Sequence, residues 1–250
     1  MLFLIFLILL LLFRGDDFEF EWVTKFNRDF SKFLNKHNLD SYNLKVENTI
    51  LENVVGVMGA SASKDPRELP KADIVFIDKN KNRIGFTSLK EGNNISRFQQ
   101  WGGISKISNT EVSDFIKRLK SYLDSKGLIK IGVLPKDVIW SEIQSQEVKN
   151  QAMWGIRYNS SSFSEENVQF IMQGFPKLTI ADNCVELGVS HLITRHNCNN
   201  IDAKSPYRPV FCALYRSGRN DFKIPNTRVF AYPAKGRIMN IDITDYVIPA

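Results

Sequence analysis

The chain has 250 residues, of which 43% are hydrophobic and 24% are charged, and these values are ordinary for a folded globular protein. A net charge of +6 is compatible with a polyanionic partner. The few cysteines, Cys184, Cys198 and Cys212, argue against a secreted disulfide scaffold and favour a reducing compartment. They lack the short CxxC spacing of structural zinc modules, so buried thiols without a ligand are favoured over a zinc site.

The N-terminal segment 1–13, MLFLIFLILLLLF, is apolar throughout. As a helix it would span about 20 Å, which is less than the roughly 30 Å hydrocarbon core of a bilayer. No Lys or Arg precedes it and no small-residue cleavage site follows it, so it is not typical of a signal peptide. A membrane tether, a leader and an artefact of a misassigned start codon remain the alternatives. The rest of the chain is expected to be cytoplasmic, without membrane association.

The first half of the chain predicts helices around a β-hairpin. Apolar residues recur at three- and four-residue spacing from Asp17 to about His37, which predicts a helix. Residues 44–57 have no clear pattern, and the small residues of 56–63 are typical of a loop. The clearest signal is a hairpin, with strands over 72–78 and 83–90 and a polar turn between them. Further elements are expected in this order: helices over 95–101 and 109–125, then a strand over 128–134.

The second half is richer in strand-like runs. A short helix is expected over 165–172, followed by strands over 177–181, 185–194, 208–215, 227–232 and 238–243. Residues 14–150 are predicted to form a core, and residues 151–250 a strand-rich part of the same domain. The order of elements indicates an α+β or mixed α/β fold.

The hairpin also carries the candidate chemistry. Asp73 opens its first strand, and Ser88-Leu89-Lys90 closes its second. Because side chains two residues apart share a face of a strand, Ser88 and Lys90 point the same way. The turn returns that end of the second strand toward Asp73. An acid and a lysine converging in this way are suited to binding a metal ion and a phosphate.

The segment 71–103, KADIVFIDKNKNRIGFTSLKEGNNISRFQQWGG, resembles the catalytic hairpin of the PD-(D/E)XK nuclease superfamily in a variant whose final motif reads Ser-x-Lys. It is also similar to restriction endonucleases and to phage proteins. The resemblance implies a restriction-endonuclease-like core of helix, central hairpin and helix. It implies that Asp73 binds Mg²⁺ or Mn²⁺ and that Lys90 positions the water and steadies the phosphate. Gln99 or Gln100 falls on a glutamine that several branches carry on the next helix.

The chain departs from this family pattern where Ser88 replaces the second acid. Glu91, Asp78 or a carboxylate of the first helix, Glu19 or Glu21, could substitute as a metal ligand. Alternatively, the serine hydroxyl or the strand backbone could hold a metal-bound water. The alternative is a purely structural role for these residues. Asp73 would then be a strand-entry acid, Lys90 an edge-strand lysine, and Glu19 and Glu21 ordinary charges at a helix N-terminus.

Basic residues crowd the last part of the chain, interleaved with tyrosines. Arg216 and Arg219 flank a predicted tight turn and Arg228 opens a predicted strand, which suits contacts with phosphate. A solvated face explains them equally well. The leading hypothesis is a metal-dependent DNA endonuclease of phage or restriction type, with RNA as an open alternative substrate and a homodimer as a compatible arrangement. The rivals are a catalytically degenerate nucleic-acid-binding or virion-associated protein and a membrane-tethered interaction protein.

Overall fold

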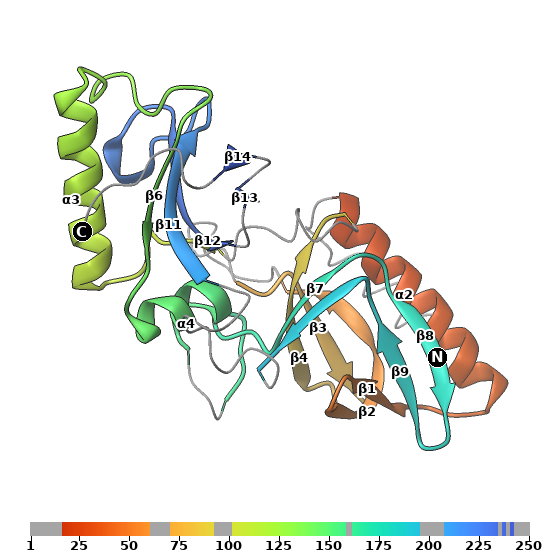
Figure 1. The fold of residues 1–250 in the computed structure, drawn as a ribbon. Coiled ribbons are helices and arrows are strands. Elements are labelled where there is room, and N and C mark those ends of the chain that lie inside the picture. Colours follow the sequence, from red (N-terminus) through yellow and green to blue (C-terminus); the bar gives the residue numbers. More distant parts are fainter. Residues whose placement is uncertain are drawn as a thin grey trace. The chain divides into compact units, whose positions relative to one another are not determined.

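The computed structural model describes residues 17–60, 71–92, 102–158, 162–195, 208–234, 237–238 and 241–242. The chain forms two compact units (Figure 1). Unit 1 contains residues 1–98 and 159–199, and unit 2 contains residues 99–158 and 200–250. The polypeptide therefore alternates between the units. From the sequence, residues 14–150 and 151–250 were predicted to be parts of the same domain.

Unit 1 begins with helix α2 (Asp17–Lys36), in agreement with the prediction. Its apolar stripe is almost completely buried and consists of Trp22, Val23, Phe26, Phe30 and Leu34. Asn27 lies on the same buried side and exchanges two hydrogen bonds with the backbone of Val57. Its Nδ2 donates to the Val57 carbonyl and its Oδ1 accepts from the Val57 N–H, both at 2.8 Å. These bonds fix α2 against the sheet of unit 1 while satisfying a buried amide.

The sheet of unit 1 has eight strands in the order β10-β7-β4-β3-β2-β1-β9-β8. Strands β2, β3 and β4 form an antiparallel meander, whereas β7 runs parallel to β4 and β9 runs parallel to β1. The strands are β1 (Tyr42–Val46), β2 (Thr49–Gly59), β3 (Ile74–Asp78), β4 (Arg83–Lys90), β7 (Phe170–Gln173), β8 (Lys177–Ala181), β9 (Cys184–Gly188) and β10 (His191–Thr194). The predicted hairpin is confirmed as β3 and β4.

Three expectations for unit 1 were wrong. Residues 56–59, expected in a loop, belong to the long strand β2. The expected helix over 165–172 is instead a turn followed by β7, because this apolar run is buried between two strands of the sheet. The expected strand over 185–194 is broken into β9 and β10. The helix expected over 95–101 lies outside the described residues.

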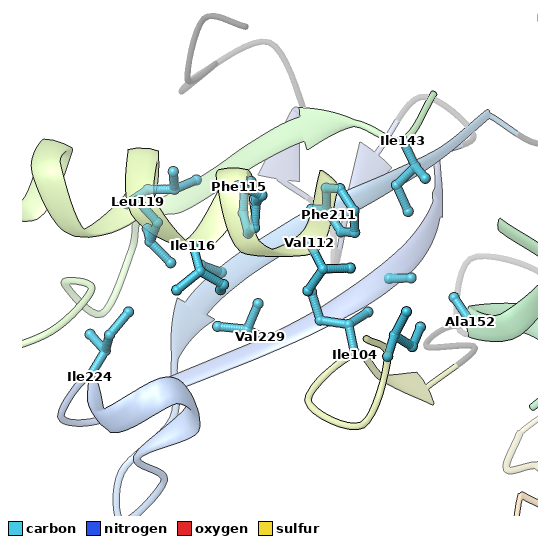
Figure 2. Packing of buried hydrophobic residues seen from close by; sticks show 14 of the residues in the cluster. Ile104, Val112, Phe115, Ile116, Leu119, Ile143, Ala152, Phe211, Ile224 and Val229 are labelled. Carbon is cyan, nitrogen blue, oxygen red and sulfur yellow. The ribbon is translucent and has the colours of Figure 1, made fainter. Parts of the chain in front are cut away.

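Unit 2 contains an antiparallel sheet of four strands in the order β5-β12-β11-β6. Helix α3 covers one of its faces, and Figure 2 shows Val112, Phe115 and Leu119 of this helix packed near Phe211 and Val229 of the strands. The elements are β5 (Gly102–Gly103), α3 (Thr110–Ser125), β6 (Val138–Glu142), α4 (Gln146–Trp154), β11 (Arg208–Tyr215), the 3-10 turn η2 (Asp221–Lys223), β12 (Thr227–Ala234), β13 (Arg237–Ile238) and β14 (Ile241–Asp242).

Both faces of the unit 2 sheet are apolar. Alternate residues of its strands point away from α3 and form a second buried cluster of Val138, Val210, Cys212, Phe230 and Tyr232. Burial raises the pKa of the Cys212 thiol well above its ordinary value. Cys184 and Cys212 are both buried, as predicted, and they form no disulfide. Cys198 lies outside the described residues.

The prediction of α3, β11 and β12 is confirmed, but the prediction for the segment between α3 and β11 was wrong. Residues 128–134, expected as a strand, form turns in which the N–H groups of Ile131 and Gly132 both donate to the Leu128 carbonyl. Strand β6 and helix α4 were not predicted. Across the described segments of both units, no helix is long and apolar enough to cross a membrane.

Candidate active site

The candidate site lies where the start of β3 meets the ends of β4 and β7. Asp73 immediately precedes β3, and its backbone N–H donates to the Thr87 carbonyl of β4 at 2.9 Å. Because β3 and β4 are antiparallel, the first residues of β3 adjoin the last residues of β4. The hairpin therefore brings Asp73 to the same end of the sheet as Ser88 and Lys90.

A continuous chain of hydrogen bonds joins these three side chains. Ser88 Oγ donates to Asp73 Oδ2 at 3.0 Å and accepts from Lys90 Nζ at 2.9 Å. The Leu89 N–H also donates to Asp73 Oδ2, at 2.6 Å. Ser88 is only 1% exposed, so water cannot readily replace its hydroxyl. The serine that departs from the family pattern thus connects the acid to the lysine.

Lys71 is a second lysine of this site and was missed in the sequence. It lies two residues before Asp73 in a segment whose backbone is held by the Glu165 carbonyl, which accepts from the N–H groups of Lys71 and Ala72 at 2.9 and 2.8 Å. Desolvation lowers the pKa of Lys71 well below its ordinary value, and the charge of Lys90 lowers it further. The carboxylates of Asp73 and Glu166 act in the opposite direction. Two-residue alternation before Asp73 could have revealed this lysine.

Gln173 supports the end of β4 from the neighbouring strand. It is opposite Lys90 in the parallel pairing of β4 with β7, and its side chain is completely buried. Gln173 Nε2 donates to the Glu91 carbonyl at 3.1 Å, and Gln173 Oε1 lies 3.0 Å from His191 Nδ1. Because the amide oxygen only accepts, His191 Nδ1 carries the proton in this bond. The buried amide thereby holds the backbone that follows Lys90.

The helix that carries the predicted acids, α2, begins near the end of the sheet where Asp73 and Lys90 lie. Trp22 Nε1 of α2 donates to the Gly174 carbonyl, just after β7, at 3.1 Å, and the rings of Phe18 and Phe175 are 5.2 Å apart. Glu19 is partly exposed and Glu21 is exposed. The structure assigns neither glutamate to a cluster of potential metal ligands.

The remaining predicted residues have different outcomes. Glu91 follows Lys90 directly, and its side chain is exposed while its carbonyl is bound by Gln173. Asp78 cannot substitute for the missing acid, because it lies at the opposite end of β3 and accepts hydrogen bonds from Asn80 and Asn82 in the hairpin turn. Gln99 and Gln100 lie outside the described residues.

The donor set at Asp73 is sparse. Within the described segments, no group of three or more His, Cys, Asp or Glu side chains is arranged to hold a metal ion. Asp73 Oδ2 accepts two hydrogen bonds, and no described residue donates to Oδ1. Mg²⁺ is commonly bound by one or two carboxylates, with water and substrate phosphate completing its shell. The site therefore fits a sparsely held Mg²⁺ and does not fit a cation enclosed by protein ligands.

The predicted nucleic-acid-binding arginines all belong to unit 2. Arg216 and Arg219 are exposed in the turn after β11, and Arg228 is partly buried in β12. Desolvation lowers the pKa of Arg228, and the charges of Arg219 and Arg216 lower it further. The N–H of Thr227, the residue before Arg228, donates to the Arg219 carbonyl at 3.2 Å, which returns the turn to β12. The structure brings these arginines together as a cluster separate from Asp73 in the chain.

Part of the chain is similar to a known restriction enzyme. Over 111 residues, which are 44% of this chain and 30% of the relative, it is 29% identical to the type II restriction enzyme CviJI of Paramecium bursaria Chlorella virus IL3A. The matched region is thus less than a third of that enzyme. No protein-family profile and no solved structure matches the chain.

Proposed function

We propose that this chain is a metal-dependent endonuclease that hydrolyses phosphodiester bonds in DNA and is of restriction or phage type. The observation that carries the proposal is the hydrogen-bonded chain of Asp73, Ser88 and Lys90 at the end of the β3–β4 hairpin. The partial similarity to a viral type II restriction enzyme supports the same class of reaction. An acid and a lysine held together at a strand end are the groups that phosphodiester hydrolysis needs.

Phosphodiester hydrolysis requires an activated water and compensation of the charge that develops on phosphorus. A divalent cation, when bound at Asp73, supplies Lewis acidity to the phosphate and to water. Lys90 has three N–H donors, of which Ser88 engages one, so it can donate to a phosphate oxygen or orient a water. Lys71 adds a second amino group near Lys90, and because burial and the charge of Lys90 lower its pKa well below the ordinary value, its charge responds to the anions bound at the site.

Ser88 has a positioning role in this proposal. Its hydroxyl donates its one proton to Asp73 and accepts from Lys90, which sets the direction of both side chains. Gln173 acts on the same strand end through the Glu91 carbonyl. Preorganisation of this kind matters because a displacement of about 1 Å in a catalytic group can lower a rate by about a hundredfold.

The test is nicking of supercoiled plasmid DNA with Mg²⁺ or Mn²⁺, comparing the native chain with Asp73→Asn. An asparagine oxygen can still accept from Ser88 and Leu89, but weaker neutral bonds replace charge-assisted ones, so we expect a stability loss of about 1–2 kcal/mol. Cleavage should be abolished. Asp78→Asn, at the other end of the same strand, is the matched control and should cleave normally. Normal cleavage by Asp73→Asn would show that Asp73 is not the metal-binding residue.

A catalytically degenerate nucleic-acid-binding protein is the second candidate function. The observation that favours it is the serine in place of the second acid, together with the lack of a three-ligand metal cluster within the described part of the chain. The same plasmid experiment separates the two candidates. If the native chain binds DNA without a metal ion but nicks it with neither Mg²⁺ nor Mn²⁺, the protein is a nucleic-acid-binding protein and not a nuclease.

A further inference from the structure

The hairpin of β11 and β12 in unit 2 presents arginines from three positions at one end. Leu214 pairs with Arg228 and Tyr215 pairs with Thr227, so the connecting segment 216–226 projects beyond this end of the sheet. Arg216 and Arg219 close a tight turn in which the Arg219 N–H donates to the Arg216 carbonyl at 3.0 Å. The connecting segment therefore returns both arginines to the strand that carries Arg228.

The charges of this cluster do not balance. The charges of Arg219 and Arg216 lower the pKa of Arg228, and Asp221 is the carboxylate that opposes them there. Asp221 Oδ2 also accepts from the Val229 N–H at 2.9 Å, which fixes the carboxylate to the backbone. The Arg228 guanidinium lies 5.6 Å from the centre of the Phe230 ring, a cation–π contact that orients it. Mutual repulsion of the guanidinium groups is relieved when an anion binds between them.

The backbone that carries the cluster is held rigidly. Phe222, Lys223 and Asn226 all have positive φ values, of 52°, 63° and 49°. Such conformations cost energy and persist only where the surroundings enforce them. Here Ile224, which directly follows η2, is buried in the main core of unit 2, and Figure 2 labels it among the residues of that core. The burial of Ile224 thus fixes segment 216–226 to the core of unit 2.

The turn at residues 131–133 also holds the end of segment 216–226 in place through hydrogen bonds. The Val133 N–H donates to Thr227 Oγ1 at 3.1 Å, and Asn226 Nδ2 donates to the Ile131 carbonyl at 3.4 Å. Gly132 has a φ of 93°, and a Cβ atom at this position would lie 1.7 Å from the Pro225 carbonyl oxygen. Only glycine permits this approach.

We propose that Arg216, Arg219 and Arg228 form a phosphate-binding site through which unit 2 contacts the DNA backbone. This inference rests on the proposed nuclease function and adds the surface that binds the substrate. Guanidinium groups bind phosphate oxygens through paired, directional hydrogen bonds. Two of the arginines are exposed to an incoming ligand, while the third is partly buried and preset by Phe230.

The test measures binding of a fluorescein-labelled duplex of about 20 base pairs by anisotropy, from about 50 to 200 mM salt, in EDTA so that cleavage is not required. Replacing Arg216 or Arg219 by Ala should reduce the slope of log affinity against log salt by about 0.9 for each lost phosphate contact. Arg216→Lys and Arg219→Lys should largely keep the slope. Asp221→Asn, which can still accept from Val229, should tighten binding.

Arg28→Ala is the matched control, because it removes the same charge from an exposed position on α2. If Arg28→Ala changes the slope as much as Arg216→Ala, or if neither Arg216→Ala nor Arg219→Ala changes it, the site is overturned. Failure of the native chain to bind the duplex also overturns it. A change in slope on an RNA duplex but not on DNA overturns the assignment to DNA.

Plasmid nicking by the same variants separates this inference from the proposed function. Unchanged slopes with intact metal-dependent nicking would overturn the phosphate site and leave the nuclease standing. Reduced slopes in a chain that never nicks would support the phosphate site and overturn the nuclease. Arg228→Ala also removes packing on Phe230, so its circular dichroism spectrum must match that of the native chain before its slope is compared.

Discussion

Replacing Ser88 by alanine tests whether this hydroxyl couples the acid to the lysine. The change removes two hydrogen bonds to charged groups, and each such bond contributes about 1.5–3 kcal/mol. Part of this loss is offset, because Asp73 keeps the bond from Leu89 and the partly exposed Lys90 can bind water. We therefore expect the free energy of unfolding of unit 1 to fall by about 2–3 kcal/mol.

Urea unfolding followed by circular dichroism measures the loss, and hydrogen exchange of peptides covering β4 assigns it to unit 1. Ser141→Ala is the matched control, since Ser141 is also a buried strand serine but accepts only a 3.3 Å bond from Arg118. A double-mutant cycle with Lys90→Met isolates the pair and should give a coupling energy of about 1 kcal/mol or more. Equal losses for Ser88→Ala and Ser141→Ala, with no coupling to Lys90, would refute the reasoning.

Three further predictions concern the same two regions. Ser88→Asp should lower the Mg²⁺ concentration needed for plasmid nicking, because it adds a carboxylate beside Asp73; an unchanged or raised requirement in a metal titration would contradict this. Gln173→Leu should destabilise unit 1 by about 2–3 kcal/mol in urea unfolding, because it removes the amide that binds the Glu91 carbonyl and His191 Nδ1. An unchanged free energy of unfolding would show that water replaces the amide. Gly132→Ala should cost about 3 kcal/mol or more in the same assay and weaken duplex binding, whereas normal stability would show that the Pro225 backbone can move.

The parts of the fold that the sequence predicted are those encoded by local patterns. Helix α2 carries its own apolar stripe, and the β3–β4 hairpin has two β-rich strands around a polar turn. Strand β7 was mistaken for a helix because its four buried residues form a short apolar run without alternation. Its identity depends on pairing with β4 and β10, which are distant in the chain. Such pairing leaves no local signal.

The candidate site divides in the same way. Asp73, Ser88 and Lys90 could be grouped from two-residue alternation and from the return of the hairpin, and the structure shows their contacts. Lys71 was accessible to the same reasoning. Gln173 was not, because its bond to the Glu91 carbonyl spans 82 residues and depends on the register of two parallel strands. The proximity of Arg228 to Arg216 likewise depends on the pairing of β11 with β12.

The alternation of the chain between the two units constrains how it can be made by a ribosome. A nascent chain ending near residue 158 has β1 to β4 of unit 1 but lacks β7, and it has α3 and β6 of unit 2 but lacks β11 and β12. Both half-built cores then expose apolar surface. Unit 1 lacks its later strands until β10 has emerged, whereas unit 2 stays incomplete until β12 has emerged, so unit 1 can finish folding first. We expect nascent chains that end near residue 158 to bind chaperones that recognise exposed apolar surface.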